Sequence, residues 1–191
     1  MRIIAGKYRS RRIHSVNPGS GNCLRQAKSS YRPTTDRAKE SLFNTLNNLI
    51  DFDSVACLDL FAGSGALGFE TLSRGAASVE FVENSAKQVK CILETAEELG
   101  VNEQVAVYNC SAIDFMTGGA NGRFYDIIFA DPPYSYDKYD VLLQKVFDTG
   151  FSIFVLEHDG KVNMMYDTNR FSETNKVTGI THFKIFSAKD E

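Results

Sequence analysis

The apolar and polar positions from residue 54 onward alternate between two spacings. Short apolar runs typical of buried strands, such as VACLDLF at 55–61 and YDIIFA at 125–130, are separated by segments whose apolar residues recur every three or four positions. Strands that alternate with helices in this way predict a mostly parallel sheet joined by right-handed crossovers. We therefore expect an α/β three-layer sandwich with a seven-stranded sheet.

The same pattern gives the expected bounds of the elements. The predicted strands are 55–61, 78–83, 105–110, 125–130 and 152–157, with two closing antiparallel strands near 170–187. The predicted helices after the first strand are 65–74, 85–99 and 137–148. Ser85 and Gln88 match a capping box at the start of helix 85–99, and Gly100 ends it. The apolar face predicted for this helix consists of Val89, Ile92, Leu93, Ala96 and Leu99.

An earlier helix is expected to begin after Pro33 and Asp36. The apolar residues with helical spacing there are Ala38, Leu42, Leu46, Leu49 and Ile50. One face of this helix should pack on the body of the protein, which is the predicted α/β sandwich. Arg37 and Lys39 are expected to face away from it.

Composition excludes several classes of protein. Hydrophobic residues make up 43% and charged residues 24% of the 191-residue chain, as in globular domains, and no apolar run approaches the ~18 residues that span a bilayer. The cysteines Cys23, Cys57, Cys91 and Cys110 form no CxxC pair, and the three histidines are scattered. We therefore expect a soluble cytoplasmic protein with reduced cysteines and no metal site.

Charge is distributed unevenly along the chain. Residues 1–39 contain ten Lys and Arg against the single acid Asp36, whereas the remaining 152 residues hold 11 basic and 23 acidic residues. A basic segment on an acidic body points to a polyanionic partner, because each neutralised phosphate releases a counterion. A merely solubilising tail is the alternative. Within this segment, 2–16 predicts a β-hairpin and the Gly- and Ser-rich stretch 17–30 predicts a loop.

A glycine-rich turn follows the first predicted strand. Gly63, Gly65 and Gly68 have the G-x-G-x-x-G spacing between a strand and a helix, and Glu83 ends the next strand 20 residues after Gly63. The glycines let the backbone approach a ligand, and Glu83 is placed to accept hydrogen bonds from ribose hydroxyls. A purely structural turn also needs glycine, and the matching acid favours a nucleotide-type cofactor.

Two cofactor classes fit this turn, the nicotinamide dinucleotides and S-adenosylmethionine. Asp59 lies four residues before Gly63, where its carboxylate would repel a diphosphate but attract the ammonium group of S-adenosylmethionine, directly or through water. The methyl donor is therefore favoured over an oxidoreductase cofactor.

The segment Asp131-Pro132-Pro133-Tyr134 follows an apolar strand directly. Its prolines remove two backbone N–H donors, so the segment presents hydrogen-bond acceptors. Asp131 and the carbonyl of Pro132 can hold the two hydrogens of an exocyclic amino group while a base stacks on Tyr134. A proline-rich turn with a surface tyrosine is the alternative. No cysteine follows a proline, so an amino nitrogen is favoured over a base carbon as the methyl acceptor.

The sequence resembles the RsmD family of bacterial small-subunit (16S) ribosomal RNA guanine-N2 methyltransferases over nearly its whole length. The matching segments are RIIAGKYRSRR at 2–12, RPTTDRAKESLFNTL at 32–46, LDLFAGSGALGFETLSRGA at 58–76, VEFVE at 79–83 and FADPPY at 129–134. The resemblance implies a class I methyltransferase fold, S-adenosylmethionine as donor and a guanine amino group of small-subunit rRNA as acceptor, in a partly or fully assembled subunit. Adenine-N6 methylation, dinucleotide-dependent oxidation and a non-catalytic RNA-binding role are the alternatives.

The resemblance also assigns residues to the site. Asp59, Gly63 and Gly65 would line the methionine part of the cofactor, Glu83 its ribose, and Ser111 and Ala112 its adenine. Asp131, Pro132 and Tyr134 match the catalytic segment. We expect a basic N-terminal extension over 1–31, a methyltransferase domain over 32–191, and a monomer. The residues expected to bind RNA are Arg2, Lys7, Arg9, Arg11, Arg12, Arg32 and Arg37.

Overall fold

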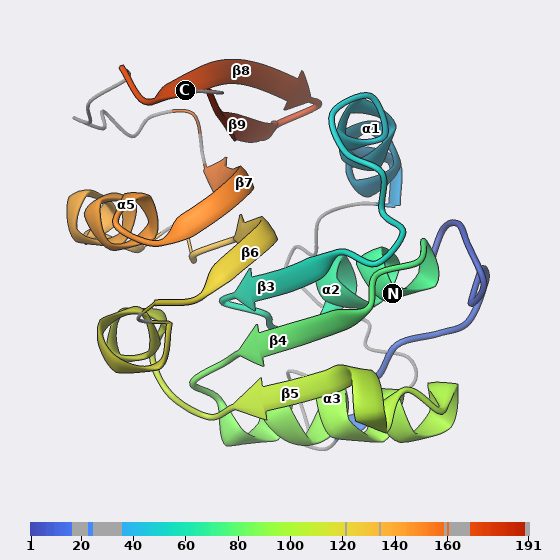
Figure 1. The fold of residues 1–191 in the computed structure, drawn as a ribbon. Coiled ribbons are helices and arrows are strands. Elements are labelled where there is room, and N and C mark those ends of the chain that lie inside the picture. The colour runs from blue at the N-terminus through green and yellow to red at the C-terminus, as the bar shows by residue number, and fades with distance from the viewer. Residues whose placement is uncertain are drawn as a thin grey trace.

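A computed structural model describes residues 1–16, 23–24, 36–120, 122–133, 135–158, 160 and 169–189. A seven-stranded sheet with the order β5-β4-β3-β6-β7-β9-β8 forms its centre (Figure 1). Its strands are β3 (Ala56–Leu60), β4 (Ser78–Val82), β5 (Val105–Tyr108), β6 (Phe124–Ala130), β7 (Gly150–His158), β8 (Phe171–Thr178) and β9 (Thr181–Ala188). The strands β3 to β7 run parallel, whereas β8 and β9 are antiparallel, as the sequence predicts.

Helices cover both faces of this sheet (Figure 1). They are α1 (Asp36–Leu46), α2 (Ala66–Ser73), α3 (Ala86–Leu99), α4 (Ala112–Asp114) and α5 (Tyr139–Phe147), with a 3-10 turn at Asn102–Gln104 and a π-helical turn at Phe115–Gly119. One apolar cluster packs α1, α2 and α3 against the sheet, and a second packs α4, the π-helical turn and α5 against the opposite face. The predicted three-layer α/β sandwich is confirmed. None of the helices in the described ranges is long and apolar enough to cross a membrane.

The strand order reverses between β3 and β6. From β3 the chain proceeds outward through β4 to β5, and then returns to the other side of β3 to form β6 and β7. In parallel sheets such a reversal opens a crevice at the carboxyl ends of the strands, where α/β proteins bind ligands. The glycine-rich turn follows β3 and Asp131 follows β6, so the two predicted motifs lie on either side of this crevice.

The basic segment at the amino terminus packs on the body. Arg2 and Arg12 form an antiparallel bridge, and β1 (Ser15–Val16) pairs with β2 (Cys23–Leu24). Ile3 and Ile13 are fully buried in the same core as α1 and α2, because the segment alternates apolar residues with exposed arginines. Residues 2–12 therefore form an antiparallel turn, close to the predicted hairpin, that packs on the core. The domain division at residue 31 stays a prediction.

Two details of the helices differ from the predictions. The Ser85 side chain makes no cap hydrogen bond; its backbone N–H instead donates to Glu83 Oε1 at 2.8 Å, so the predicted capping box is wrong. Leu93 and Leu49 are about half exposed rather than packed, because α3 presents a narrower apolar face and α1 ends at Leu46. Gly100 ends α3 in a left-handed conformation, as predicted.

The cysteines also differ in part from the prediction. Cys57 and Cys110 are free thiols. Cys91, fully buried on α3, is disulfide-bonded, so the expectation of four reduced cysteines is wrong. Sequence spacing gave no signal for this bond, because disulfide pairing depends on tertiary proximity.

Candidate active site

The turn after β3 is built on left-handed backbone. Phe61 has φ 57°, Gly63 has φ 55° and Gly65 has φ 76°. A Cβ atom on Gly65 would lie 2.9 Å from the Phe69 ring, so this glycine is needed for close packing as well as for its φ. A Cβ atom on Gly63 would have no neighbour nearer than 3.9 Å. The backbone at Gly63 therefore faces open space, which a ligand can approach.

Glu83 joins this turn to the end of β4. Its Oε2 accepts a hydrogen bond from the Gly63 N–H at 2.8 Å, and its Oε1 accepts one from the Ser85 N–H at 2.8 Å. The carboxylate is fixed in one orientation by these bonds. Each oxygen keeps a further lone pair, so Glu83 retains two acceptor sites for a diol.

Asp59 lies beneath the turn, within β3. Its side chain is 2% exposed, and its Oδ2 accepts a hydrogen bond from the Gly68 N–H at 3.0 Å. Burial raises the pKa of Asp59 to about 8; the Gly68 bond opposes the rise, and the nearby Glu83 charge adds to it. A buried carboxyl group of this kind favours a cationic ligand group, which would stabilise its ionised form.

Asp131 and Pro132 leave the sheet at the end of β6. Asp131 is partly buried and Pro132 is buried. Burial raises the pKa of Asp131 well above its usual value, and the charges of Glu157 and Asp59 raise it further. Ionisation of Asp131 in the free protein is therefore less favourable than for an exposed aspartate.

Glu157 was not singled out by the sequence. Ala130 on β6 is in register with Leu156 on β7, so the next residues, Asp131 and Glu157, are neighbours at the same edge of the sheet. Glu157 is 6% exposed. The signal was present, because Glu157 also ends a predicted apolar strand, as Glu83 does.

Aromatic rings lie between the two motifs. The Tyr136 ring meets the Phe61 ring edge-on at 5.1 Å and the Tyr139 ring at 5.3 Å. Phe61 is in the left-handed region, which is uncommon for a bulky residue and costs energy that the surrounding contacts must offset. Tyr134, the predicted stacking residue, lies outside the described residues. Tyr136 is an aromatic residue of this site that the motif analysis missed.

The predicted adenine-binding residues follow β5. The Ser111 hydroxyl caps α4: it accepts from the Asp114 N–H at 3.1 Å and donates to Asp114 Oδ2 at 2.7 Å. Both hydrogen bonds of the Ser111 hydroxyl are thus made within the α4 turn. Ala112, 4% exposed, begins α4, where a backbone N–H has no partner within the helix.

The predicted RNA-binding residues divide into two groups. Arg2 pairs with Asp36 at 2.9 Å, and Arg11 donates to the Glu98 carbonyl at 2.9 Å. Of the residues predicted to bind RNA, Lys7, Arg9, Arg12 and Arg37 are exposed and have no ion pair to any described residue. Arg32 lies outside the described residues.

Over the described ranges, no group of three His, Cys, Asp or Glu side chains is arranged to hold a metal ion. The carboxylates of Asp59, Glu83 and Asp131 come from three different strands. The part of the crevice at the carboxyl ends of β3 and β4 suits a ligand with a diol and a cation. The part at the carboxyl end of β6 offers hydrogen-bond acceptors.

Residues 1–187 match the family model described as Conserved hypothetical protein 95. The chain is 33% identical over 193 residues to the ribosomal RNA small subunit methyltransferase D of Haemophilus influenzae, with 97% of this chain and 93% of that protein covered. A putative methyltransferase of Escherichia coli of known structure aligns with a TM-score of 0.78 and 27% identity over 100% of this chain and 99% of that one. The magnesium protoporphyrin IX methyltransferase of Synechocystis PCC 6803, solved with bound S-adenosylmethionine, shares the fold with a TM-score of 0.61 and 17% identity over 80% and 77% of the two chains. The expected class I methyltransferase fold is thereby confirmed.

Proposed function

The chain belongs to the family described as Conserved hypothetical protein 95, and on that premise we propose that it transfers a methyl group from S-adenosylmethionine to the N2 amino group of a guanine in small-subunit ribosomal RNA. One observation carries the proposal: the acceptor segment Asp131-Pro132 leaves β6 opposite the Gly63–Glu83 turn, across the reversal of strand order. The substrate we propose is rRNA within a partly or fully assembled small subunit, bound by a monomer of this chain.

The residues of the turn fit the proposed cofactor. Glu83 would accept hydrogen bonds from the two ribose hydroxyls, for which it keeps two acceptor sites. Asp59 would attract the ammonium group, and the open backbone at Gly63 would admit the methionine part. Ala112 would offer its N–H beside the adenine. The bound cofactor supplies an electrophilic methyl group on a sulfonium.

Asp131 and Pro132 act on the amino nitrogen of the base. The lone pair of that nitrogen is delocalised into the ring, so the site must hold the nitrogen in line with the methyl carbon. The Asp131 carboxylate and the Pro132 carbonyl would each accept one N–H of the amino group. A positive charge develops on the nitrogen during transfer, and the ionised Asp131 would stabilise it. The methylated nitrogen would then lose one proton to solvent water.

Replacing Glu83 with alanine should weaken S-adenosylmethionine binding by about 1.5 to 3 kcal/mol, the range for hydrogen bonds to a charged group. The single-turnover rate at saturating cofactor should change less, because Glu83 lies at the ribose and not at the reacting atoms. Calorimetric titration of the cofactor measures the effect. An unchanged affinity would exclude Glu83 from the cofactor site.

Cofactor binding should release up to about one proton at pH 7. The pKa of Asp59 is raised to about 8 in the free protein, so its carboxyl is mostly protonated at pH 7, and the ligand ammonium would favour ionisation. The affinity should therefore rise with pH until about pH 8. Calorimetry in buffers with different ionisation enthalpies measures the released proton. Asp59→Asn should abolish this buffer dependence; a dependence that persists in this variant would place the titration elsewhere.

The proposed reaction is tested with small subunits from cells that lack the gene. Purified protein and S-adenosylmethionine carrying a labelled methyl group should label the rRNA, and nuclease digestion should yield N2-methylguanosine. Label found in N6-methyladenosine instead would show that adenine, and not guanine, is the methyl acceptor. Absence of label in subunits and in free rRNA would contradict the proposal.

A further inference from the structure

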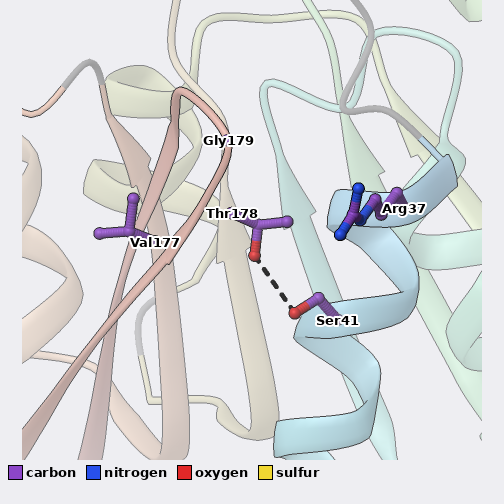
Figure 2. Close-up of a pocket in the computed structure, with 5 residues that line it drawn as sticks. All are labelled: Arg37, Ser41, Val177, Thr178 and Gly179. Carbon is purple, nitrogen blue, oxygen red and sulfur yellow. Dashed lines mark hydrogen bonds between the residues drawn. The ribbon is translucent and has the colours of Figure 1, made fainter.

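A pocket of about 510 Å³ lies between α1 and the turn that joins β8 to β9. Figure 2 shows its lining: Arg37 and Ser41 lie on α1 across from the β8–β9 hairpin, the Thr178 side chain points toward Ser41, and the Val177 side chain points away from α1. Its volume is within the range of small-ligand sites in proteins. Neither the glycine-rich turn nor the Asp131 segment lines this pocket, whereas segment 32–46 contributes Arg37 and Ser41.

The topology places the pocket at the same edge of the sheet as Asp131. The strand β9 runs antiparallel to β7 with His182 opposite His158, so the β8–β9 turn lies beside the carboxyl end of β7. Asp131 follows the adjacent strand β6, whose last residue Ala130 is in register with Leu156. An RNA strand that places a base at Asp131 would therefore pass near this pocket.

The lining has the chemistry of an anion site. Arg37 is exposed and makes no ion pair with a described residue, so its guanidinium is available to a ligand. Thr178 Oγ1 donates to Ser41 Oγ at 3.2 Å (Figure 2), which leaves the Ser41 hydroxyl hydrogen for another acceptor. A hydroxyl that already accepts a hydrogen bond is polarised and becomes a better donor. Guanidinium and hydroxyl donors together suit a phosphate group.

The hairpin side of the pocket is a tight turn. Val177 is the apolar residue of the lining and is 59% exposed, on the other side of β8 from the Thr178 hydroxyl (Figure 2). Gly179 has φ 66° at the first position of the two-residue turn between Thr178 and Thr181, which keeps the hairpin tip narrow.

We propose that this pocket binds a phosphodiester group of the RNA strand next to the target nucleotide, with Arg37 as the charged ligand and Ser41 as the neutral donor. The inference rests on the proposed function, because it takes RNA as the substrate. A base can reach Asp131 only after it leaves its stack, and this requires the flanking backbone to be held. A phosphate contact beside the crevice would fix that backbone without reading its sequence.

The test compares Arg37→Ala with Arg170→Ala. Arg170 is also exposed, but it precedes β8 at the opposite end of the same hairpin, so it controls for the loss of one arginine. Arg37→Ala should weaken binding of unmodified small-subunit rRNA about tenfold and lower the slope of log K against log salt by about 0.7 to 0.9, the value for one phosphate contact. S-adenosylmethionine affinity should be unchanged. Arg37→Lys should recover part of the loss, because it keeps the charge but not the planar fork.

Four outcomes would overturn the proposal. Equal RNA affinity for Arg37→Ala and wild type would show that the pocket holds no phosphate. A loss of similar size in Arg170→Ala would reveal a general charge effect. A loss seen with intact subunits but not with naked rRNA would assign the pocket to a ribosomal protein. A loss of S-adenosylmethionine affinity in Arg37→Ala would mark a cofactor contact or altered folding. These binding assays need no turnover, so they test whether the pocket binds an RNA phosphate even if methyl transfer itself is not observed.

Discussion

We expect Asp131→Ala to lower the single-turnover rate of methyl transfer about 100- to 1000-fold, which is the cost of removing a comparable electrostatic group from other active sites. A carboxylate that opposes the charge developing on the nitrogen acts more strongly in the transition state than in the ground state. The rate should therefore fall while S-adenosylmethionine affinity stays nearly intact. Unmodified small subunits and saturating cofactor are the conditions of the measurement.

Asp131→Asn is the matched control. Its amide carbonyl still accepts one hydrogen bond but carries no charge, so this variant should retain more activity than Asp131→Ala. It also avoids the raised pKa that burial and Glu157 impose on the native carboxyl, so its rate should depend less on pH. A fully active Asp131→Ala enzyme would show that this segment does not hold the acceptor.

The parts of this molecule that the sequence predicted are those encoded locally. The apolar run before Asp131 and the one before Glu83 each specify a strand, and the glycines after β3 specify a left-handed turn. These motifs occupy the carboxyl ends of neighbouring strands, and the order of strands and helices was enough to bring them to one edge.

The features that the sequence did not predict depend on partners far along the chain. Lys39 was expected to face away from the body, yet it is fully buried, because Glu70 lies opposite it and no helical spacing encodes that pairing. The capping box, in contrast, failed for a local reason: Glu83, two residues before Ser85, accepts the Ser85 N–H that Gln88 was expected to accept. The pocket at Arg37 joins α1 to a hairpin 137 residues later, as the bond between Ser41 and Thr178 shows.

Glu70 organises the contact between the basic segment and the body. It is fully buried on α2, and its carboxylate accepts the N–H groups of Ile4 at 2.7 Å and Ala5 at 3.0 Å. It also pairs with Arg74 at 2.9 Å and with Lys39 at 3.4 Å. Burial lowers the pKa of Lys39, and the Glu70 charge opposes that shift. The ionised state of Lys39 thus depends on Glu70.

Glu70→Ala should therefore lower the free energy of unfolding by about 3 to 5 kcal/mol, the cost of leaving buried charges uncompensated. The variant leaves two cations and two backbone N–H groups without their acceptor. Urea unfolding measures the loss, with Glu97→Ala, an exposed acid on α3, as a control that should change stability by less than about 0.5 kcal/mol. The double variant Lys39→Met/Glu70→Leu should recover much of the loss, because apolar replacements of a buried pair avoid its desolvation. A loss below about 1 kcal/mol in Glu70→Ala would mean that water reaches these groups and that other contacts hold the basic segment, such as the burial of Ile3 and Ile13 and the hydrogen bond from the Tyr8 N–H to Ser73 Oγ.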